Sequence, residues 1–364
     1  MTIVLKETIY IHFLVRDNQS DVMRTNFIGI FLIIVCLPNY SQVISGTVFD
    51  NETKKQIPYA NVFFNGTTIG TYTDNYGKFD LILPKDGKFP IAFSAIGYET
   101  ILLSDYSTDQ PIRVSMNPKI YELDEVIISS KMSLGDRLTR KYYLNLFKKQ
   151  FFGVSLNGSQ CKILNENDIV MQYLTDKDIL KAYSNKPLII INKALGYQIT
   201  YYIDKFECSP SGNLVNLYGC SIFKEDITLD VKQQIRAGKR RKIAYLGSRM
   251  QLFRSLWNND LDSAGFTLKN TRNKELTYDS LVIQTDSSIK YLKRKGIVNI
   301  AYFSKQSDTQ IKILKDSVYF NKSGYFDPYL ISWDGEMANQ RIGDMLPFDY
   351  LYKKTTTNMV KKSY

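Results

Sequence analysis

The stretch Val43–Met116 constrains the fold most strongly, because it consists of short alternating runs separated by turn residues. Apolar residues take every second position in the run 78–83, and the run 110–116 repeats the pattern. Successive side chains of a strand point to opposite faces, so each run predicts a strand with one buried face. Strands of this kind in series are typical of a small antiparallel β-sandwich, which we predict over residues 43–117.

Turn residues support the same interpretation. Asn75 and Gly77 stand where a tight hairpin needs residues that tolerate positive φ. The aspartates of the region have two interpretations, as calcium ligands or as turn residues: Asp50, Asp74 and Asp80. The spacing of a calcium-binding loop is absent, so we favour turns.

Four motifs follow one another in this stretch: Gly46-x-Val48-x-Asp50, Pro58-x-Ala60-Asn61-Val62, Gly70-x-x-Thr73-Asp74-x-x-Gly77-x-Phe79 and Ser94-x-x-Gly97-Tyr98. In this order they resemble the carboxypeptidase regulatory-like domain. The resemblance implies a transthyretin-like sandwich of about seven strands. Such domains stand beside the catalytic domain of some metallocarboxypeptidases and at the N-terminus of TonB-dependent outer-membrane transporters. Leu123–Ile128 resembles the segment that follows the domain in those transporters.

The residues before the sandwich predict export. Met23–Asn26 is a short basic start, and Phe27–Leu37 is an apolar run too short to span a bilayer. Cleavage near Ser41 or Gln42 would release a chain that begins just before the first predicted strand. We therefore expect residues 23–42 to be a signal peptide and the mature protein to be exported, in the periplasm, at the outer membrane or on the cell surface.

Two features of this leader have alternatives. We expect Met23 to be the working start and residues 1–22 an upstream extension, the alternative being a genuine long N-terminal region from Met1. Cys36 would suit a lipoprotein, but Val35 precedes it where a small residue is expected.

Histidine usage argues against peptidase chemistry. The only histidine, His12, lies before Met23, so the mature chain would contain none. Ser-His-Asp and Cys-His nucleophilic systems and zinc sites of the His-Glu-His kind all need histidine. We predict no catalytic residue, cofactor or metal. Asp260 and Asp262 would be the carboxylates of an alternative hydrolase, although they stand on a predicted turn without a partner constellation.

The charge balance favours an anionic partner. Lys and Arg number 47 against 36 Asp and Glu, a net charge of +11. For an exported chain this excess suits the envelope, an acidic glycan or an anionic membrane surface better than nucleic acid. Five cations stand on one predicted helix and are the candidate ligand-binding residues, to contact phosphate, lipid A or a glycan carboxylate: Arg236, Lys239, Arg240, Arg241 and Lys242. The alternative is a solvated helix face.

Three cysteines would remain after processing, and we expect free thiols. Cys208 and Cys220 flank a predicted hairpin turn, which would place Cys220 near Tyr202. Cys208 would then lie roughly six strand positions, about 20 Å, from Cys220, beyond disulfide reach. Cys161 leaves the total odd.

The rest of the chain predicts a second module. Residues 118–133 are a linker or strand, and residues 134–364 a β-rich α+β domain with two prominent helices, Leu134–Phe152 and Asp230–Trp257. The aromatic residues Tyr325, Phe326, Tyr329 and Trp333 would form either a sugar platform or, as we favour, a flap over the core.

We therefore expect a mainly β, two-domain exported protein that binds a protein or glycan partner without catalysis. The first alternative is a carboxylate-dependent hydrolase in the C-terminal domain. The second is a scaffold that docks onto a TonB-dependent transporter.

Overall fold

The computed structural model describes residues 42–84, 87–119, 134–211, 214–285, 289–293, 296–304, 306 and 308–352. From Val43 onward the chain forms one compact unit. The predictions made for residues 1–41, including the signal peptide, His12 and Cys36, lie outside the described residues. The same holds for residues 120–133 of the predicted linker, so the predicted domain limits stay predictions.

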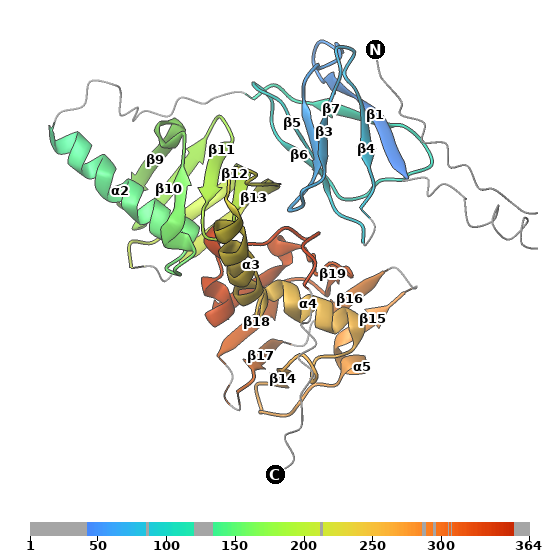
Figure 1. The fold of residues 1–364 in the computed structure, drawn as a ribbon, viewed down its shortest axis with the longest axis vertical. Coiled ribbons are helices and arrows are strands. Elements are labelled where there is room, and N and C mark those ends of the chain that lie inside the picture. Colours follow the sequence, from blue (N-terminus) through green and yellow to red (C-terminus); the bar gives the residue numbers. More distant parts are fainter. Residues whose placement is uncertain are drawn as a thin grey trace, which may run out of the picture. The chain divides into compact units, whose positions relative to one another are not determined.

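The N-terminal part is a sandwich of a three-stranded and a four-stranded sheet, as predicted (Figure 1). The first sheet has the order β4-β1-β7, with β1 Val43–Asp50 antiparallel to β4 Lys78–Ile82 and parallel to β7 Ile112–Met116. The second has the order β3-β2-β5-β6 and comprises β2 Asn61–Phe64, β3 Gly70–Tyr72, β5 Ile91–Ser94 and β6 Ile101–Leu103.

Alternation and turn chemistry explain this sandwich. Phe79 and Leu81 of β4 are buried in its core, and the residues between them are exposed, as the pattern predicted. Gly77 has φ +65° in the hairpin before β4. The side chains of Asp50 and Asp74 accept hydrogen bonds from backbone N–H groups of their own turns, at 2.8–2.9 Å. The turn interpretation of these two aspartates is confirmed.

A six-stranded sheet follows, with the order β8-β11-β12-β10-β9 and β13 paired to β12. Its strands are β8 Cys161–Ile163, β9 Ile169–Leu174, β10 Ile179–Ser184, β11 Leu188–Asn192, β12 Tyr197–Cys208 and β13 Val215–Glu225. Cys220 lies opposite Tyr202 in the β12–β13 register, as predicted. All three described cysteines are free thiols.

The helix α2, Leu134–Phe152, has the predicted bounds and packs on this sheet. Phe147 and Phe151 are fully buried, but Leu138 and Tyr142 are 62% and 59% exposed. The first half of the helix therefore leaves its apolar residues exposed, because the first turns of α2 extend past β9 (Figure 1).

Two further sheets share a second hydrophobic core with α4, Arg249–Asn258. One has the order β14-β17-β18-β20, comprising β14 Phe266–Asn270, β17 Ile297–Tyr302, β18 Thr309–Ile313 and β20 Ile331–Gly335. The other has the order β15-β16-β19, comprising β15 Val282–Gln284, β16 Lys290–Lys293 and β19 Ser317–Phe320. A one-turn helix, α5 Tyr278–Leu281, precedes β15. The mainly β prediction is confirmed, and residues 134–352 are built around two cores.

The single helix predicted over residues 230–257 is wrong. The chain forms α3, Val231–Tyr245, and then α4 after a break at Gly247, which has φ +73°. Ser248 begins α4 by accepting a hydrogen bond from the Gln251 N–H at 3.1 Å. Periodicity missed the break because apolar residues continue at helical spacing across it, whereas only glycine readily adopts this backbone conformation.

The sandwich and the six-stranded sheet are joined by the turn that follows β2. The Gly66 N–H donates to the Ser221 carbonyl at 2.7 Å, and the Phe223 N–H donates to the Thr67 carbonyl at 2.9 Å. The Asn65 side chain accepts from the Ser221 N–H at 2.9 Å. The turn therefore continues the hydrogen bonding of β13, and it fixes one wall of the site described next.

Candidate functional site

A cavity of about 190 Å³ lies where this turn meets the rest of the chain. Its walls come from residues 65–66 of the sandwich, from β12 and β13, from the start of α4, and from the segments 325–328 and 340–348. Elements far apart in the sequence thus enclose one space, and each is held by hydrogen bonds of its own.

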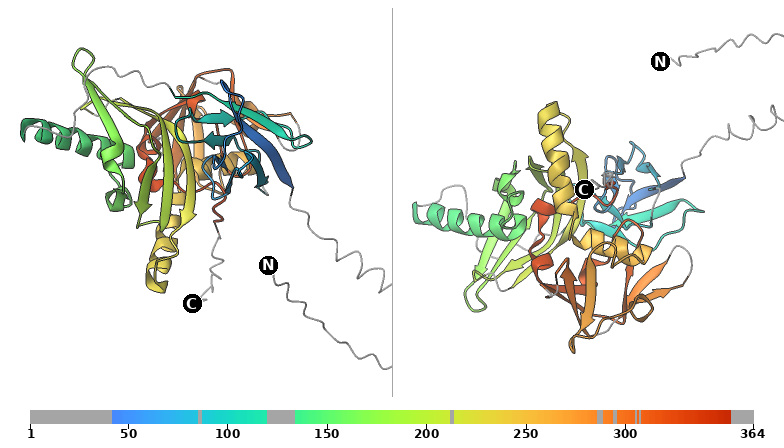
Figure 2. Two further views of the ribbon diagram at one scale, coloured as in Figure 1. Left: turned by 90° about the horizontal axis from the view of Figure 1, so that it is seen from above. Right: turned by 60° about the horizontal axis from the view of Figure 1, so that its bottom comes forward.

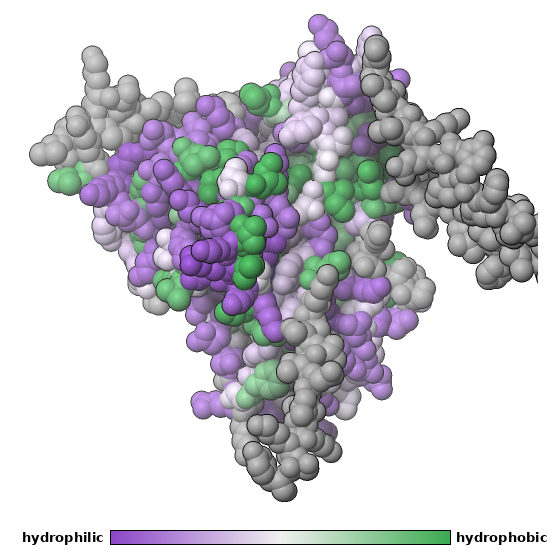
Figure 3. Space-filling model, in the orientation of Figure 1, coloured by the Kyte–Doolittle hydropathy of each residue, from purple (hydrophilic) through white to green (hydrophobic). Residues whose placement is uncertain are grey.

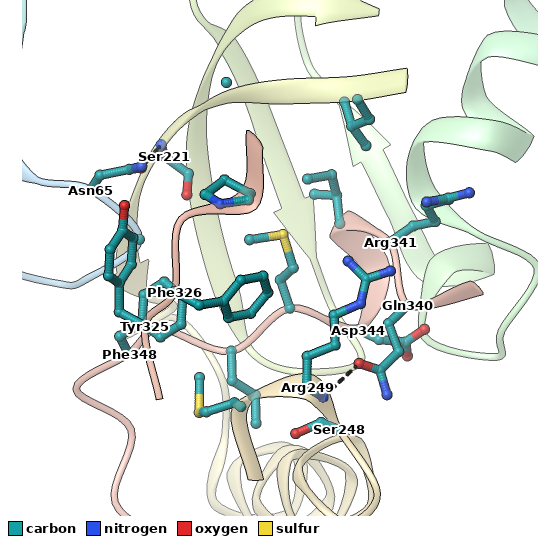
Figure 4. A pocket seen from close by; sticks show the side chains of 18 of the residues that line it. Asn65, Ser221, Ser248, Arg249, Tyr325, Phe326, Gln340, Arg341, Asp344 and Phe348 are labelled. Carbon is teal, nitrogen blue, oxygen red and sulfur yellow. Dashed lines mark hydrogen bonds between the residues drawn. The ribbon is translucent and has the colours of Figure 1, made fainter. Parts of the chain in front are cut away.

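Aromatic side chains form one side of the cavity. Tyr325, Phe326 and Phe348 lie together with Asn65, opposite the polar residues (Figure 4). Tyr325 and Phe326 are 5% and 8% exposed. Gly66 is needed here, because it has φ +75° and a Cβ at this position would lie 2.7 Å from the Phe348 ring.

Arg249 forms the opposite side and is the first residue of α4. Its backbone N–H donates to the Gln340 Oε1 at 3.0 Å, and its Nε donates to the Met337 carbonyl at 2.8 Å. The guanidinium lies 4.6 Å from the centroid of the Trp333 ring. None of the ion pairs among the described residues includes Arg249.

Arg341 lines the same cavity and is half-buried. Within the described part of the chain its guanidinium has no hydrogen bond and no ion pair. Burial lowers the pKa of Arg249, and the neighbouring Arg341 charge lowers it further. Burial also lowers the pKa of Arg341. Both guanidinium groups therefore lose part of their hydration, and in the described residues neither has a carboxylate in direct contact.

Asp344 is the one acidic residue among the described residues that line this cavity. Its Oδ1 accepts from the Asn157 Nδ2 at 2.8 Å, and the Asn157 Oδ1 accepts from the Arg240 Nη1 at 3.0 Å. In the described part of the molecule no ion pair joins Asp344 to Arg249 or Arg341. Its carboxylate is held by this chain of hydrogen bonds instead.

The segments that carry these residues are fixed to the core. Arg254 of α4 donates to the carbonyls of Ser323, Phe348 and Tyr350 at 2.9–3.0 Å. Asn192 at the end of β11 donates to the Gly343 carbonyl at 2.9 Å. The cavity is thus largely pre-formed, as binding sites usually are.

The five cations predicted as ligand-binding residues are not brought together. Arg236 and Lys239 are exposed on α3, which protrudes beside the sheet in both views of Figure 2. Arg240 and Lys242 are half-buried. Arg241 points to the protein instead and is described next. Figure 3 shows hydrophilic residues with hydrophobic ones between them over α3, where Val231, Ile235 and Ile243 are 56–71% exposed.

Arg241 is a structural residue. Its Nε and Nη2 donate to the carbonyls of Leu195 and Gly196 at 2.6 and 3.0 Å. Its Nη1 forms an ion pair with Glu225 at 2.7 Å, and the guanidinium lies 3.9 Å from the Tyr197 ring centroid. These contacts attach α3 to the β11–β12 turn and use three of the five N–H donors of the guanidinium.

The other candidates fall outside the cavity or into the core. Asp260 and Asp262 lie in the turn after α4 and do not line the cavity. Phe326 stacks on Phe253 at 4.4 Å, and Tyr329 stacks on Tyr218 at 4.5 Å. Phe326 thus packs in the core as the predicted flap would, but Trp333 lies on strand β20, and Tyr325 and Phe326 also line the cavity.

Two surveys of the described residues complete the description of the site. Among them, no cluster of three or more His, Cys, Asp or Glu side chains is placed to hold a metal ion. None of their helices combines the length and the apolarity that a membrane span requires.

Comparison with known proteins identifies one part of the chain. Residues 44–128 match the CarboxypepD_reg-like domain. The sandwich is a carboxypeptidase regulatory-like domain. No curated protein matches the chain. The matched segment includes β1–β7 and the turn at Asn65 and Gly66, so one wall of the cavity belongs to this domain.

Sequence reasoning missed Arg249 and Arg341. The pair Gly247-Ser248 was a signal for a new helix start, and it would have drawn attention to the cation at the first position of α4. Nothing in the sequence around Arg341 distinguishes it, because its importance depends on residues about 90 positions away.

Proposed function

We propose that this is an exported, non-catalytic protein of the cell envelope that binds part of a protein or glycan partner in the cavity beside the regulatory-like domain. The observation that carries the proposal is the wall composition: arginines on one side, aromatic rings on the other, and a turn of the regulatory-like domain closing the space. Convergent polar groups in a concave, partly aromatic site are typical of ligand binding.

The envelope location is supported by the sequence. Residues 23–42 have the pattern of a signal peptide, and the excess of cations suits an anionic surface or glycan. The regulatory-like domain is itself a non-catalytic module. The volume of about 190 Å³ is below the range of roughly 300–1,000 Å³ for drug-sized ligands, so the cavity suits an end group of a larger partner.

A second candidate is a scaffold that docks onto a TonB-dependent transporter. The observation that favours it is a set of exposed tyrosines around the β2–β4 part of the sandwich: Tyr59, Tyr72 and Tyr76, which are 66–68% exposed. Tyrosines are enriched in protein interfaces, so this surface offers a contact separate from the cavity.

The test combines location with binding. Mass spectrometry of the mature N-terminus, with cell fractionation, should find a chain that begins near Ser41 in the envelope fraction. Retention on envelope extracts and glycan arrays should fall when the cavity is filled by Ala244→Leu. Ala338→Leu, outside the cavity lining, is the control. An intact Met1 in the cytosol, or retention that Ala244→Leu leaves unchanged, would overturn the proposal. If both variants, Ala244→Leu and Ala338→Leu, capture only a transporter from the extracts, the scaffold is favoured.

A further inference from the structure

We infer that the cavity binds an oxyanion, a carboxylate or a phosphate, which Arg249 holds, with Arg341 adding positive charge nearby, while its apolar body rests on Tyr325 and Phe326. The inference rests on the proposed function, because it assumes that the cavity is a binding site. It names the chemical class of the group that enters.

Arg249 and Arg341 have N–H donors without a hydrogen-bond acceptor among the described residues. A guanidinium has five N–H donors arranged as a planar fork. The Nε of Arg249 donates a hydrogen bond to the Met337 carbonyl, and neither of its Nη groups has a partner among the described residues. The Arg341 guanidinium has none of its donors paired within that same part of the chain. The two residues therefore retain the donor sets that bind carboxylate or phosphate in bidentate fashion.

The positive charges of Arg249 and Arg341 are in an unfavourable electrostatic environment. Two like charges in a desolvated space repel each other, and each also loses hydration. The lowered pKa of Arg249 has these two causes, burial first and the Arg341 charge second. Asp344 lines the same cavity but forms no ion pair with either arginine among the described residues, so one carboxylate offsets the two positive charges only in part. An oxyanion at the Arg249 guanidinium would offset both the lost hydration and the repulsion between the two charges.

The N-terminus of α4 also faces the cavity. Arg249 and Met250 are the first residues of this ten-residue helix, and both line the cavity. Ser248 caps the Gln251 N–H, and Gln340 accepts from the Arg249 N–H. No described residue accepts from the Met250 N–H. The positive end of the helix dipole therefore adds to the potential of the two arginines.

The aromatic residues determine what the rest of the ligand can be. Tyr325, Phe326 and Phe348 offer an apolar surface opposite Arg249, whereas the Arg341 side chain points away from the rings (Figure 4). A free inorganic ion would leave that surface unfilled. An oxyanion attached to a small apolar or ring-shaped body would contact both sides at once, and the small volume limits the body to about one ring.

The experiment uses small probes on the full mature chain. Isothermal titration calorimetry would compare benzoate, phenyl phosphate, inorganic phosphate and the neutral benzyl alcohol. Wild type should bind benzoate or phenyl phosphate more tightly than benzyl alcohol, and added salt should weaken this binding. Arg249→Gln and Arg341→Gln should each weaken it about tenfold or more, the effect of losing a charge-assisted hydrogen bond.

Controls separate charge from folding. Arg236→Gln removes the same charge from the exposed face of α3 and should bind as wild type does. Arg249→Lys and Arg341→Lys keep the charge but lose the fork, so they should restore only part of the affinity. Melting temperatures would show that each variant is folded. If a Gln variant does not fold, the result from the corresponding Lys variant decides.

The outcomes are distinct. Binding of benzoate without phenyl phosphate identifies a carboxylate, and the reverse identifies a phosphate ester. Equal binding of benzyl alcohol and benzoate, no binding of either anionic aromatic probe, or wild-type affinity in folded Arg249 and Arg341 variants would overturn the oxyanion. If the oxyanion fails while Ala244→Leu still abolishes envelope retention, the proposed function stands. If retention ignores Ala244→Leu, the proposed function fails whatever the probes do.

Discussion

Two groups of cations, those of α3 and the pair Arg249 and Arg341, behave in opposite ways. The cations of α3 are dense in the sequence, yet Arg236 and Lys239 face solvent and the guanidinium of Arg241 is bound to acceptors of the protein itself. Arg249 and Arg341 are isolated in the sequence, yet the fold brings them into one cavity and leaves them without anionic partners in the described residues. In this protein the closely spaced cations of α3 lie mostly on a solvated face, whereas the arginines that lack an ion-pair partner line the cavity.

The free energies behind the two groups differ in sign. Arg241 combines an ion pair, two carbonyl acceptors and a tyrosine ring, so its desolvation is compensated. Arg249 and Arg341 lose hydration and repel each other. A protein that keeps such a pair sacrifices some stability, as binding and catalytic sites commonly do.

The largest expected effect is at Arg241. Arg241→Ala should lower the free energy of unfolding by about 2–4 kcal/mol, because it leaves two carbonyls and Glu225 without their donor. Urea unfolding would measure the change. Arg236→Ala is the matched control on the same helix and should change stability by no more than about 0.5 kcal/mol. Equal effects of the two substitutions would contradict the contrast drawn within α3.

Ser248 separates the two groups by starting a new helix. Ser248→Ala should cost about 1 kcal/mol, because the Gln251 N–H loses its cap. It should also weaken binding of an anionic probe in the cavity, since the start of α4 would fray. Ser263→Ala, in the exposed turn after α4, is the control for loss of a serine hydroxyl. Thermal unfolding and calorimetry would follow both effects, and an unchanged midpoint for Ser248→Ala would argue against the cap.

Removal of an unpaired cation should not lower the free energy of unfolding, in contrast to the two substitutions above. Arg341→Met should leave the free energy of unfolding unchanged or raise it by about 1 kcal/mol, because it removes a desolvated charge and keeps an apolar side chain. The same variant should lose affinity for an anionic probe. Urea unfolding at low and high salt would test this. A loss of more than about 1 kcal/mol would assign Arg341 a structural role.

The smallest effects are expected on the exposed face of α3. Arg236→Glu combined with Lys239→Glu should change stability by no more than about 0.5 kcal/mol, since both residues are exposed. Retention on lipopolysaccharide or acidic glycan arrays would show whether this face contributes to binding. If the double variant is no longer retained on the arrays but still binds the anionic probe in the cavity, α3 is a second binding surface. If it is retained as wild type is, α3 does not contribute to binding.

The sandwich could be predicted because its information is local. The run at Phe79 and Leu81 alternates with period two, and the turn at Gly77 needs the backbone freedom of glycine. The position of Cys220 opposite Tyr202 followed from the hairpin, since register is set by the turn. Helix α2 was also predicted with its observed bounds.

The candidate site could not be predicted in the same way. The helix break at Gly247 was hidden by apolar spacing that continues across it, so the cation that opens α4 was not recognised. Arg341 acquires its importance only when segment 340–348 lies against α4 and β13. Such contacts between distant segments leave no periodic signal in the sequence.

The sequence by itself determined the regulatory-like sandwich, the β-rich second half, the spacing of the cysteines and the excess of positive charge. The tertiary structure decided which cations are satisfied and which are not. The physical reason is that strand and turn preferences depend on neighbouring residues, whereas the solvation and pairing of a charge depend on every group that the fold places around it.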